Sequence, residues 1–426
     1  MTESTTSAPR GRPIQTAADR IRAFYEAHPY PPPVDDLAAY RARWDDPSRR
    51  RASHHLFWPG VPFGTGRSVL VAGCGTAQAA RHAMRDPGNR VVGIDVSRTG
   101  IDATLALKER HGLDNLEVRK LPLEEAAQLE ERFDLVVCTG VLHHLPDPHR
   151  GLAALREVLA PGGALHLMVY APYGRAGVYL IQRYARILGI EPTPEEVEAL
   201  VGAVREVPPD HPLRPLLGKS PDFQSREGLA DALLNPQDRA YAVPELLELV
   251  RGAGLQHGRW LRQAPYLPAC GAPLLTPHRD RLAALEPDDQ WAAMELFRGT
   301  MVRHSALLRR DDEALPGPEG SVGDVPETAW RHWVPVRVPD TIEVVEGIPD
   351  TAAAVLINRN HSWNDLYLPI DRRQAEWLEA MDGVRTLREI FGEEEDVEEG
   401  WSFAQRLLAY DQVVFDTSIR PPDTNP

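Results

Sequence analysis

The sequence predicts an α/β protein in which a doubly wound sheet is followed by a smaller α+β unit. Apolar runs at 69–72 and 133–138 carry no polar alternation, which is typical of parallel strands buried on both faces. Helix-like segments, such as the one at 150–160 with its leucines on one face, separate these runs. A segment rich in Pro, Gly and acidic residues at 311–327 then precedes a second set of strands and helices.

The length of 426 residues exceeds what one hydrophobic core usually organises, so two units are expected. The first residues are rich in Ser, Thr and Pro, which predicts disorder because little there can be buried. The predicted divisions are a disordered N-terminus at 1–18, a helical lid segment at 19–67, a sheet domain at 68–310 with an insertion at about 172–238, a linker at 311–327 and an accessory α+β domain at 328–420.

Composition excludes several classes of protein. The chain has 47 Lys and Arg against 62 Asp and Glu, a formal charge of −15, and without a segregated basic face this repels nucleic acid. The three cysteines, Cys74, Cys138 and Cys270, form no CxxC pair, which predicts neither disulfides nor a thiolate zinc site and fits a reducing cytoplasm. No apolar run is long enough for a membrane span or a signal peptide. The pair His54 and His55 lacks further residues at metal-ligand spacing, so no metal is expected.

The stretch VLVAGCGT at 69–76 runs an apolar strand into a glycine turn. Gly73 and Gly75 would let a ligand approach the backbone, although Gln78 stands where a dinucleotide fingerprint has its third glycine. Asp95 follows about 20 residues later at the end of a second strand, where a carboxylate can accept hydrogen bonds from a ribose diol. An ordinary tight turn and a helix N-cap at Asp95 are the alternatives. The spacing predicts an adenosine-type ligand without choosing among cofactors.

These segments, with GIDVS at 93–97, FDLVVCTGVLHHLPDP at 133–148 and LAPGGALHLMV at 159–169, resemble the class I S-adenosylmethionine-dependent methyltransferases. The resemblance implies a Rossmann-like sheet, S-adenosylmethionine as cofactor and methyl transfer. It departs from the family at Val71 and Ala72, where an acidic residue is common, and after the third strand, where Leu121 and Glu124 stand near the slot of an adenine-binding aspartate. The implied cofactor-binding residues are Gly73, Gly75, Asp95, Leu121, Glu124, Thr139 and Gly140.

Acceptor-side residues are expected after the fourth and fifth strands. His143 and His144 follow the fourth strand, where one of them could take a proton from the acceptor; the alternative is that they only fix the loop. For the residues after the fifth strand the alternative is packing, and for the group at 238–241 it is a salt-bridged cap of the next helix. The candidate substrate residues are Tyr170, Tyr173, Arg175, Asp238, Arg239 and Tyr241.

The accessory domain is expected to hold strands at 352–359, 365–370 and 412–416, with helices at 372–383, 386–392 and 401–411. Its helices weakly resemble PqqD-like winged-helix modules, which bind peptides. The sequence therefore predicts a methyltransferase acting on a small molecule, with a recruited peptide acceptor and a noncatalytic cofactor-binding protein as alternatives. No nucleic-acid or membrane partner is expected, and a homodimer is left open. Truncation after Arg310 should leave a soluble cofactor-binding domain unless the accessory unit packs obligatorily on the rest.

Overall fold

A seven-stranded sheet forms the centre of the larger domain in the computed structural model, which describes residues 16–64, 66–218, 220, 223–317, 325–392 and 397–419. The strand order is β3-β2-β1-β4-β5-β7-β6. The predicted doubly wound sheet is confirmed. It is mixed, because β7, a strand that the sequence did not indicate, runs antiparallel to both of its neighbours. The strands are β1 Ser68–Ala72, β2 Arg90–Asp95, β3 Leu116–Lys120, β4 Phe133–Thr139, β5 Leu159–Tyr170, β6 Leu255–Trp260 and β7 Arg303–Arg310.

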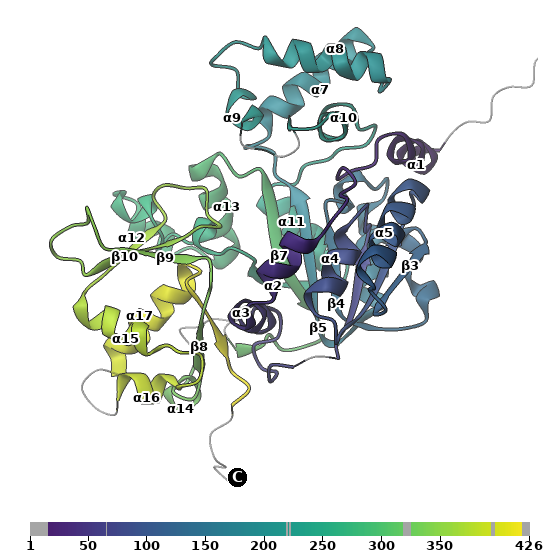
Figure 1. The fold of residues 1–426 in the computed structure, drawn as a ribbon. Helices are drawn as coiled ribbons and strands as arrows, with labels where there is room; N and C mark the ends of the chain where they lie inside the picture. Colours follow the sequence, from purple (N-terminus) through teal and green to yellow (C-terminus); the bar gives the residue numbers. More distant parts are fainter. Residues whose placement is uncertain are drawn as a thin grey trace, which may run out of the picture.

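Helices cover both faces of this sheet, as doubly wound strands require (Figure 1). Successive side chains of one strand point to opposite faces. Leu70 of β1 therefore joins the core under α6 (Pro148–Glu157) and α11 (Val243–Gly252), whereas Val71 joins the core under α3 (Pro47–Phe57), α4 (Gln78–Arg85) and α5 (Arg98–His111). The near-continuous apolar strands predicted from the sequence are confirmed, since β1, β2 and β4 are almost wholly buried.

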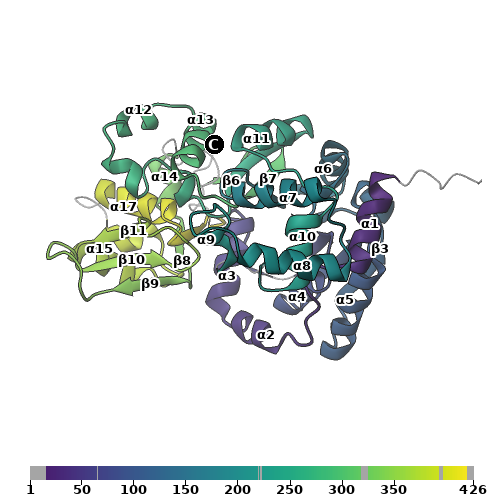
Figure 2. The ribbon, with the colours of Figure 1, turned by 90° about the horizontal axis from the view of Figure 1, so that it is seen from above.

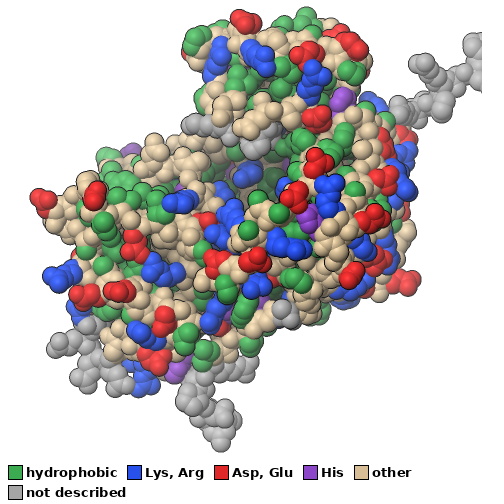
Figure 3. Space-filling model, viewed as in Figure 1, with side chains coloured by type: hydrophobic (Ala, Val, Ile, Leu, Met, Phe, Trp, Pro, Cys, Tyr) green, Lys and Arg blue, Asp and Glu red, His purple; other side chains and the backbone are tan. Residues whose placement is uncertain are grey.

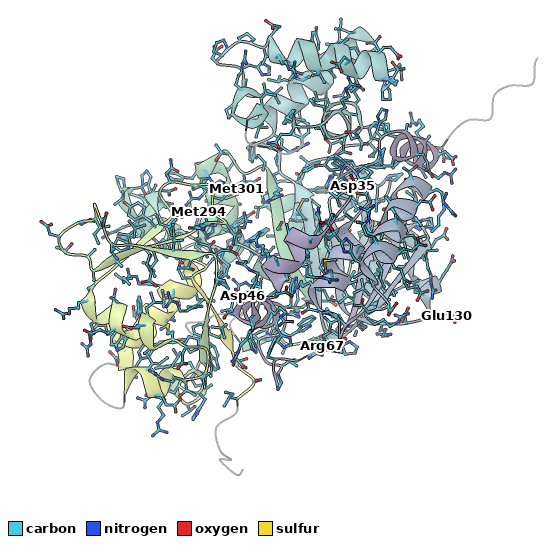
Figure 4. All side chains as sticks on the ribbon, in the orientation of Figure 1. Asp35, Asp46, Arg67, Glu130, Met294 and Met301 are labelled. Carbon is cyan, nitrogen blue, oxygen red and sulfur yellow. The ribbon has the colours of Figure 1, made fainter. Side chains whose placement is uncertain are left out.

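The carboxyl ends of the parallel strands meet at one edge of the sheet, which we call the carboxyl edge. In Figure 4, Met301 lies at this edge, just before antiparallel β7, while Arg67 and Glu130, which precede parallel strands, lie at the opposite edge. Register pairs Arg303 at the start of β7 with Tyr170 at the end of β5. Residues that follow β1, β2, β4 and β5 thus share this edge with the first residues of β7.

The predicted insertion forms a helical lobe above the carboxyl edge (Figure 1). Its helices pack on one another around a small core that includes Val178, Leu200 and Leu229. The N-terminal α1 (Ala17–Ala27), capped by Thr16, contacts the lobe through Phe24. The first 15 residues of the predicted disordered segment lie outside the described residues. The helices of the lobe are α7 Ala176–Leu188, α8 Pro194–Arg205, α9 Arg214–Leu217 and α10 Arg226–Leu234.

The C-terminal unit lies beside the sheet domain, with α3 packed against its β8 and β12 (Figure 2). The strands and helices expected there are present, with every end within four residues of its predicted position, whereas the sequence did not indicate α14, β8 or β9. Its elements are α14 Glu327–Trp330, β8 Val334–Arg337, β9 Thr341–Val344, β10 Ala354–Asn358, β11 Tyr367–Ile370, α15 Arg372–Ala380, α16 Leu387–Phe391, α17 Val397–Ala409 and β12 Val413–Asp416. The resemblance to PqqD-like modules stays a prediction.

Contacts between the C-terminal unit and the rest of the chain are both apolar and ionic. Ala264 and Cys270 of the sheet domain are part of the core of the unit. Asp340 pairs with Arg49 of α3 at 2.7 Å, and Asp411 pairs with Arg259 at 3.4 Å. Part of the predicted linker, residues 318–324, lies outside the described residues. Among the helices described, none is both long and apolar enough to cross a bilayer.

Candidate active site

The glycine turn after β1 needs both of its glycines. Gly73 has φ +71° and Gly75 has φ +52°, a region that L side chains rarely adopt. A Cβ at Gly73 would lie 2.3 Å from Cγ2 of Val141, and one at Gly75 would lie 3.1 Å from the carbonyl oxygen of Tyr30. Close approach to the β4 loop on one side and to the N-terminal segment on the other therefore excludes larger residues.

Asp95 ends β2 and holds this turn in place. Its Oδ2 accepts a hydrogen bond from the Gly75 N–H at 2.8 Å, and its Oδ1 accepts one from the Ser97 N–H at 2.8 Å. The N-cap of α5 is Ser97, so the capping alternative for Asp95 does not hold. Burial raises the pKa of Asp95, against the lowering effect of these N–H groups. Each carboxylate oxygen retains a further lone pair that a ribose hydroxyl can use.

A cavity of about 310 Å³ opens at this point of the carboxyl edge. Asp95 and Glu124 are the only carboxylates among its described lining residues, so a ligand ammonium group has few partners there. Val71 and Ala72, which replace the acidic residue common in the family, are fully buried in β1. All the residues expected to bind cofactor line this cavity: Gly73, Gly75, Asp95, Leu121, Glu124, Thr139 and Gly140. Their roles as ligands remain proposals.

Segments outside the sheet close the cavity. Tyr25 and Tyr30 come from the N-terminal segment, and Phe223 comes from the insertion. The Thr76 hydroxyl donates a hydrogen bond to the carbonyl oxygen of Pro31 at 2.8 Å, which ties the N-terminal segment to the glycine turn. The sequence predicts a lid at 19–67 and favours residues 24–33 and 219–244 as the segments that determine substrate choice. Tyr25, Tyr30 and Phe223 belong to those two segments, although the sequence does not single them out individually. Figure 3 shows a hollow between the helical lobe and the sheet.

The two adjacent histidines after β4 have different surroundings. His144 lines the cavity, and its Nδ1 lies 2.7 Å from the carbonyl oxygen of Gln237. Because a carbonyl only accepts, Nδ1 carries the proton and Nε2 holds a lone pair in the neutral ring. His143 is buried against the Tyr170 ring, with centroids 4.0 Å apart, and does not line the cavity. Burial lowers the pKa of His143, with further lowering by His144 and Arg175, so its ring is neutral.

A buried carboxyl group lies beside the His144 ring. Nε2 of His144 lies 3.9 Å from Oδ1 of Asp231, which also accepts hydrogen bonds from the Tyr25 hydroxyl at 2.8 Å and from Nδ2 of Asn235 at 3.0 Å. Burial raises the pKa of Asp231. Asp231 and Tyr25 were not predicted as site residues, since they lie 206 residues apart in the sequence. Together they place a buried carboxyl group beside Nε2 of His144.

The loop after β4 and the segment before α11 bring together a set of potential metal ligands. One nitrogen of His143, one of His144 and one carboxylate oxygen of Asp238 lie within 4.8 Å of one another. Imidazole and carboxylate groups suit several divalent metals. The Arg175 guanidinium acts electrostatically on His143 and would oppose a bound cation. The absence of a metal stays a prediction.

The predicted substrate residues separate into two groups. Tyr170 and Arg175 line the cavity, and the Arg175 guanidinium lies 3.5 Å from the centre of the Tyr170 ring. The other four do not line it. Tyr173 is 43% exposed, Asp238 accepts a hydrogen bond from Gln182 at 2.7 Å, the Arg239 N–H donates to the His143 carbonyl, and the Tyr241 N–H donates to the Tyr170 carbonyl.

Residues 238–241 bind the loop after β4 and the end of β5 through the Arg239 and Tyr241 N–H groups, and they do not cap α11. The N-cap of that helix is Ala242, whose N–H donates to the Glu245 carboxylate at 2.9 Å. The salt-bridged cap proposed for Asp238 and Arg239 is therefore not the arrangement found. The Arg239 guanidinium instead lies over the Tyr241 ring, 4.8 Å from its centre.

Comparisons with known proteins identify the class to which this site belongs. Residues 70–165 match the family model described as a methyltransferase domain. Together with the Rossmann-like sheet, the glycine turn and Asp95, this match shows that the chain contains a class I S-adenosylmethionine-dependent methyltransferase domain. The match excludes the whole insertion and the whole C-terminal unit.

The alignments with individual relatives span only part of each relative. An uncharacterized protein from Synechococcus sp. is 34% identical over 247 residues, which is 55% of this chain and 58% of that protein. The ubiquinone biosynthesis O-methyltransferase of Bordetella avium is 33% identical over 142 residues, 30% of this chain and 57% of that protein. The chain thus spans somewhat more than half the length of these curated relatives.

A solved structure resembles the chain beyond the methyltransferase domain. PKMT2 from Rickettsia typhi, in complex with AdoHcy, aligns with a TM-score of 0.59 over 87% of this chain and 75% of that chain, at 14% sequence identity. At that identity the likeness concerns the fold alone.

Proposed function

We propose that this chain is an S-adenosylmethionine-dependent methyltransferase that transfers a methyl group to an oxygen or nitrogen of a small-molecule acceptor. The observation that carries the proposal is the cavity at the carboxyl edge, which has Asp95 and the glycine turn in its wall together with His144, Tyr170 and Arg175. The first group suits the cofactor, and the second group suits an acceptor. A cytoplasmic location belongs to this proposal, since all three cysteines are free thiols.

The glycine turn and Asp95 account for cofactor binding. The backbone at Gly73 and Gly75 can approach the methionyl part of the cofactor because no Cβ intervenes. Asp95 is already oriented by the Gly75 and Ser97 N–H groups, so little ordering is needed when it accepts the ribose hydroxyls.

Methyl transfer requires alignment more than chemical activation. The acceptor lone pair attacks the methyl carbon, the carbon–sulfur bond breaks, and its electron pair neutralises the sulfonium to leave S-adenosylhomocysteine. A closed cavity holds the reacting atoms in line and excludes water. Tyr25, Tyr30 and Phe223 provide that closure from two segments outside the sheet.

The acceptor loses a proton when its hydroxyl or amine is methylated, and His144 is the group we assign to receive it. Its Nε2 holds the free lone pair, and the imidazolium formed would face the Asp231 carboxyl at 3.9 Å and the Gln237 carbonyl at 2.7 Å. His143 supports the ring of Tyr170 and takes no proton in this scheme.

A small acceptor is supported by enclosure and by one relative. Three regions of the chain surround the cavity, which leaves little room for a folded protein to enter. The Bordetella avium relative is named as an O-methyltransferase of ubiquinone biosynthesis, which is chemistry on a small molecule.

Transfer of labelled methyl groups tests the proposal. The full chain is incubated with methyl-labelled S-adenosylmethionine and a cell extract that has been separated into small-molecule and polypeptide fractions. We expect label in the small-molecule fraction and the appearance of S-adenosylhomocysteine. Label in the polypeptide fraction alone would favour a recruited peptide acceptor. Cofactor binding without transfer to either fraction would favour the noncatalytic alternative.

A further inference from the structure

A second cavity of about 310 Å³ lies between the sheet domain and the C-terminal unit. Its walls come from α3 and α4, from the middle strands of the sheet, from the segment after β6, and from the C-terminal unit. Gln78 lines both this cavity and the cofactor cavity, and it donates a hydrogen bond to Thr139 at the end of β4. The two cavities therefore adjoin at Gln78.

Positive charge dominates the lining of the second cavity. Arg49, Arg85, Arg259 and Arg262 line it, against the two carboxylates of Asp340 and Asp411. Arg85 is paired at 3.0 Å with Asp86, which does not line the cavity. The histidines in its wall add no charge, because burial lowers the pKa of His82 to about 3 and that of His166 to about 4. A net cationic cavity stands out in a chain whose formal charge is −15.

Both carboxylates already have cationic partners. Asp340 pairs with Arg49 at 2.7 Å and with Arg43 at 3.2 Å. Asp411 lies 3.4 Å from Arg259 and 3.2 Å from His361, and it also accepts hydrogen bonds from the N–H groups of Gln263 and Ala264. Neither carboxylate forms an ion pair with Arg262.

Topology brings a second arginine close to Arg262. Arg262 follows β6, which runs parallel to the central strands, and Arg303 begins antiparallel β7, so both lie at the carboxyl edge. Arg303 lines the cofactor cavity. Burial, followed by the charge of Arg303, lowers the pKa of the Arg262 guanidinium. Within the described parts of the chain, no carboxylate forms an ion pair with either side chain.

We propose that Arg262 and Arg303 bind a carboxylate or phosphate group of the methyl acceptor, which occupies the second cavity and presents its nucleophile to the cofactor cavity past Gln78. This inference rests on the proposed methyltransferase function and adds the substrate class, an anionic small molecule. Asp411 and Asp340 attract Arg262 only from beyond ion-pair distance, so an anion between the two guanidinium groups would relieve their mutual repulsion. Forked guanidinium groups match the oxygens of carboxylate and phosphate. Figure 3 shows Lys and Arg side chains beside the hollow below the helical lobe, with Asp and Glu side chains among them.

Probe binding tests the anion site without requiring turnover. The full chain, with and without S-adenosylhomocysteine, is titrated calorimetrically with benzoate and benzamide, which share a ring but differ in charge, and with inorganic phosphate. We expect benzoate or phosphate to bind, and benzamide to bind at least about tenfold more weakly than benzoate. Comparison of the benzoate and phosphate titrations distinguishes an acceptor that bears a carboxylate from one that bears a phosphate group.

Variants assign the binding to the arginines. Arg262→Gln and Arg303→Gln should each weaken anion binding by about tenfold or more, while Arg262→Lys should retain part of it. Arg372→Gln, at a side chain that is 92% exposed on the C-terminal unit, is the matched control and should change nothing. Arg262→Gln should leave S-adenosylhomocysteine affinity unaltered, because Arg262 does not line the cofactor cavity.

Two failures are distinguishable in this design. Equal binding of benzoate and benzamide, no binding of any anion, or full anion binding by Arg262→Gln would overturn the anion site whatever the cofactor does. Failure of S-adenosylhomocysteine to bind would instead overturn the proposed function, and the titrations without S-adenosylhomocysteine would still report on the arginines.

Discussion

Oδ2 of Asp95 accepts a hydrogen bond from the N–H of Gly75 at 2.8 Å, so the end of β2 is bound directly to the turn after β1. The two residues lie 20 positions apart in sequence. One contact therefore fixes the carboxylate proposed for the ribose and the backbone proposed for the methionyl group relative to each other.

Replacing Asp95 by Ala should weaken S-adenosylhomocysteine binding by roughly 10- to 150-fold, since hydrogen bonds to a charged group contribute about 1.5–3 kcal/mol. Calorimetric titration measures the dissociation constant. Asp102→Ala, at an exposed position on α5 in the same region, is the control. An unchanged constant for Asp95→Ala would leave the residue with a purely structural role in the turn.

Gly73→Ala should disrupt the cofactor turn by crowding as well as by backbone strain. Its Cβ would lie 2.3 Å from Cγ2 of Val141, whereas a Cβ at Gly162, with a similar φ of +70°, would meet nothing within 4 Å. Gly162→Ala therefore measures strain alone, about 1–2 kcal/mol. We expect Gly73→Ala to lower the free energy of unfolding in urea by about 1–3 kcal/mol more than Gly162→Ala does. Adding Val141→Ala should restore part of this loss, because it removes the crowding methyl groups. An equal loss in the free energy of unfolding for Gly73→Ala and Gly162→Ala would contradict the proposed crowding against Val141.

His144→Gln should lower kcat by roughly a hundredfold while changing S-adenosylhomocysteine affinity little, as expected for loss of a proton acceptor. His143→Gln should mainly lower the free energy of unfolding, because His143 is buried against Tyr170 and does not line the cavity. Steady-state kinetics and thermal unfolding of both variants separate these effects. An equal fall in turnover in both variants would contradict the assignment of His144 as the proton acceptor.

Acidification should destabilise the fold between about pH 6.5 and pH 4. Burial lowers the pKa of His82 and His257 to about 3 and that of His166 to about 4, so the unfolded chain binds more protons than the folded chain below pH 6.5. Their stabilising effect is complete above the unfolded pKa and is lost as the pH falls, by about 1.4 kcal/mol per histidine for each unit.

Urea unfolding at several pH values measures this slope. His257→Gln should flatten it, and His278→Gln, at an exposed position, should not. Stability that stays constant from pH 7.5 to pH 5 would contradict the assignment of neutral buried histidines.

Truncation after Arg310 should yield an aggregating protein. The cut would uncover Ala264 and Cys270, which belong to the core of the C-terminal unit, and Ala52, which packs on Val336 and Val414. These contacts favour the obligatory packing that the sequence left as an alternative. Size-exclusion chromatography and S-adenosylhomocysteine titration decide the question. A monodisperse fragment with the cofactor affinity of the full chain would establish the unit as an independent module.

The sequence predicted the parts of the site that depend on local pattern. Strands buried on both faces read as apolar runs, and Gly73, Gly75 and Asp95 sit at positions that the strand ends define. Strand β7 was missed because Arg303–Arg310 has arginines at both ends and a short apolar centre, and because its antiparallel direction depends on tertiary pairing.

Contacts between distant segments could not be predicted. Tyr25 meets Asp231 only after α1 packs on the insertion, and the second cavity combines α3, α4, the sheet and the C-terminal unit. Such arrangements depend on how whole elements pack, which a pattern of a few residues does not encode. Arg262 and Arg303 likewise gain their relationship from strand direction and not from spacing in the sequence.

The structure of the full chain in complex with S-adenosylhomocysteine tests the central claim most directly. We predict that the ligand occupies the cavity at the carboxyl edge, with both ribose hydroxyls within hydrogen-bond distance of the Asp95 carboxylate and the homocysteine moiety against the backbone of Gly73 and Gly75. A ligand bound elsewhere, or a ribose without contact to Asp95, would contradict the account of the site.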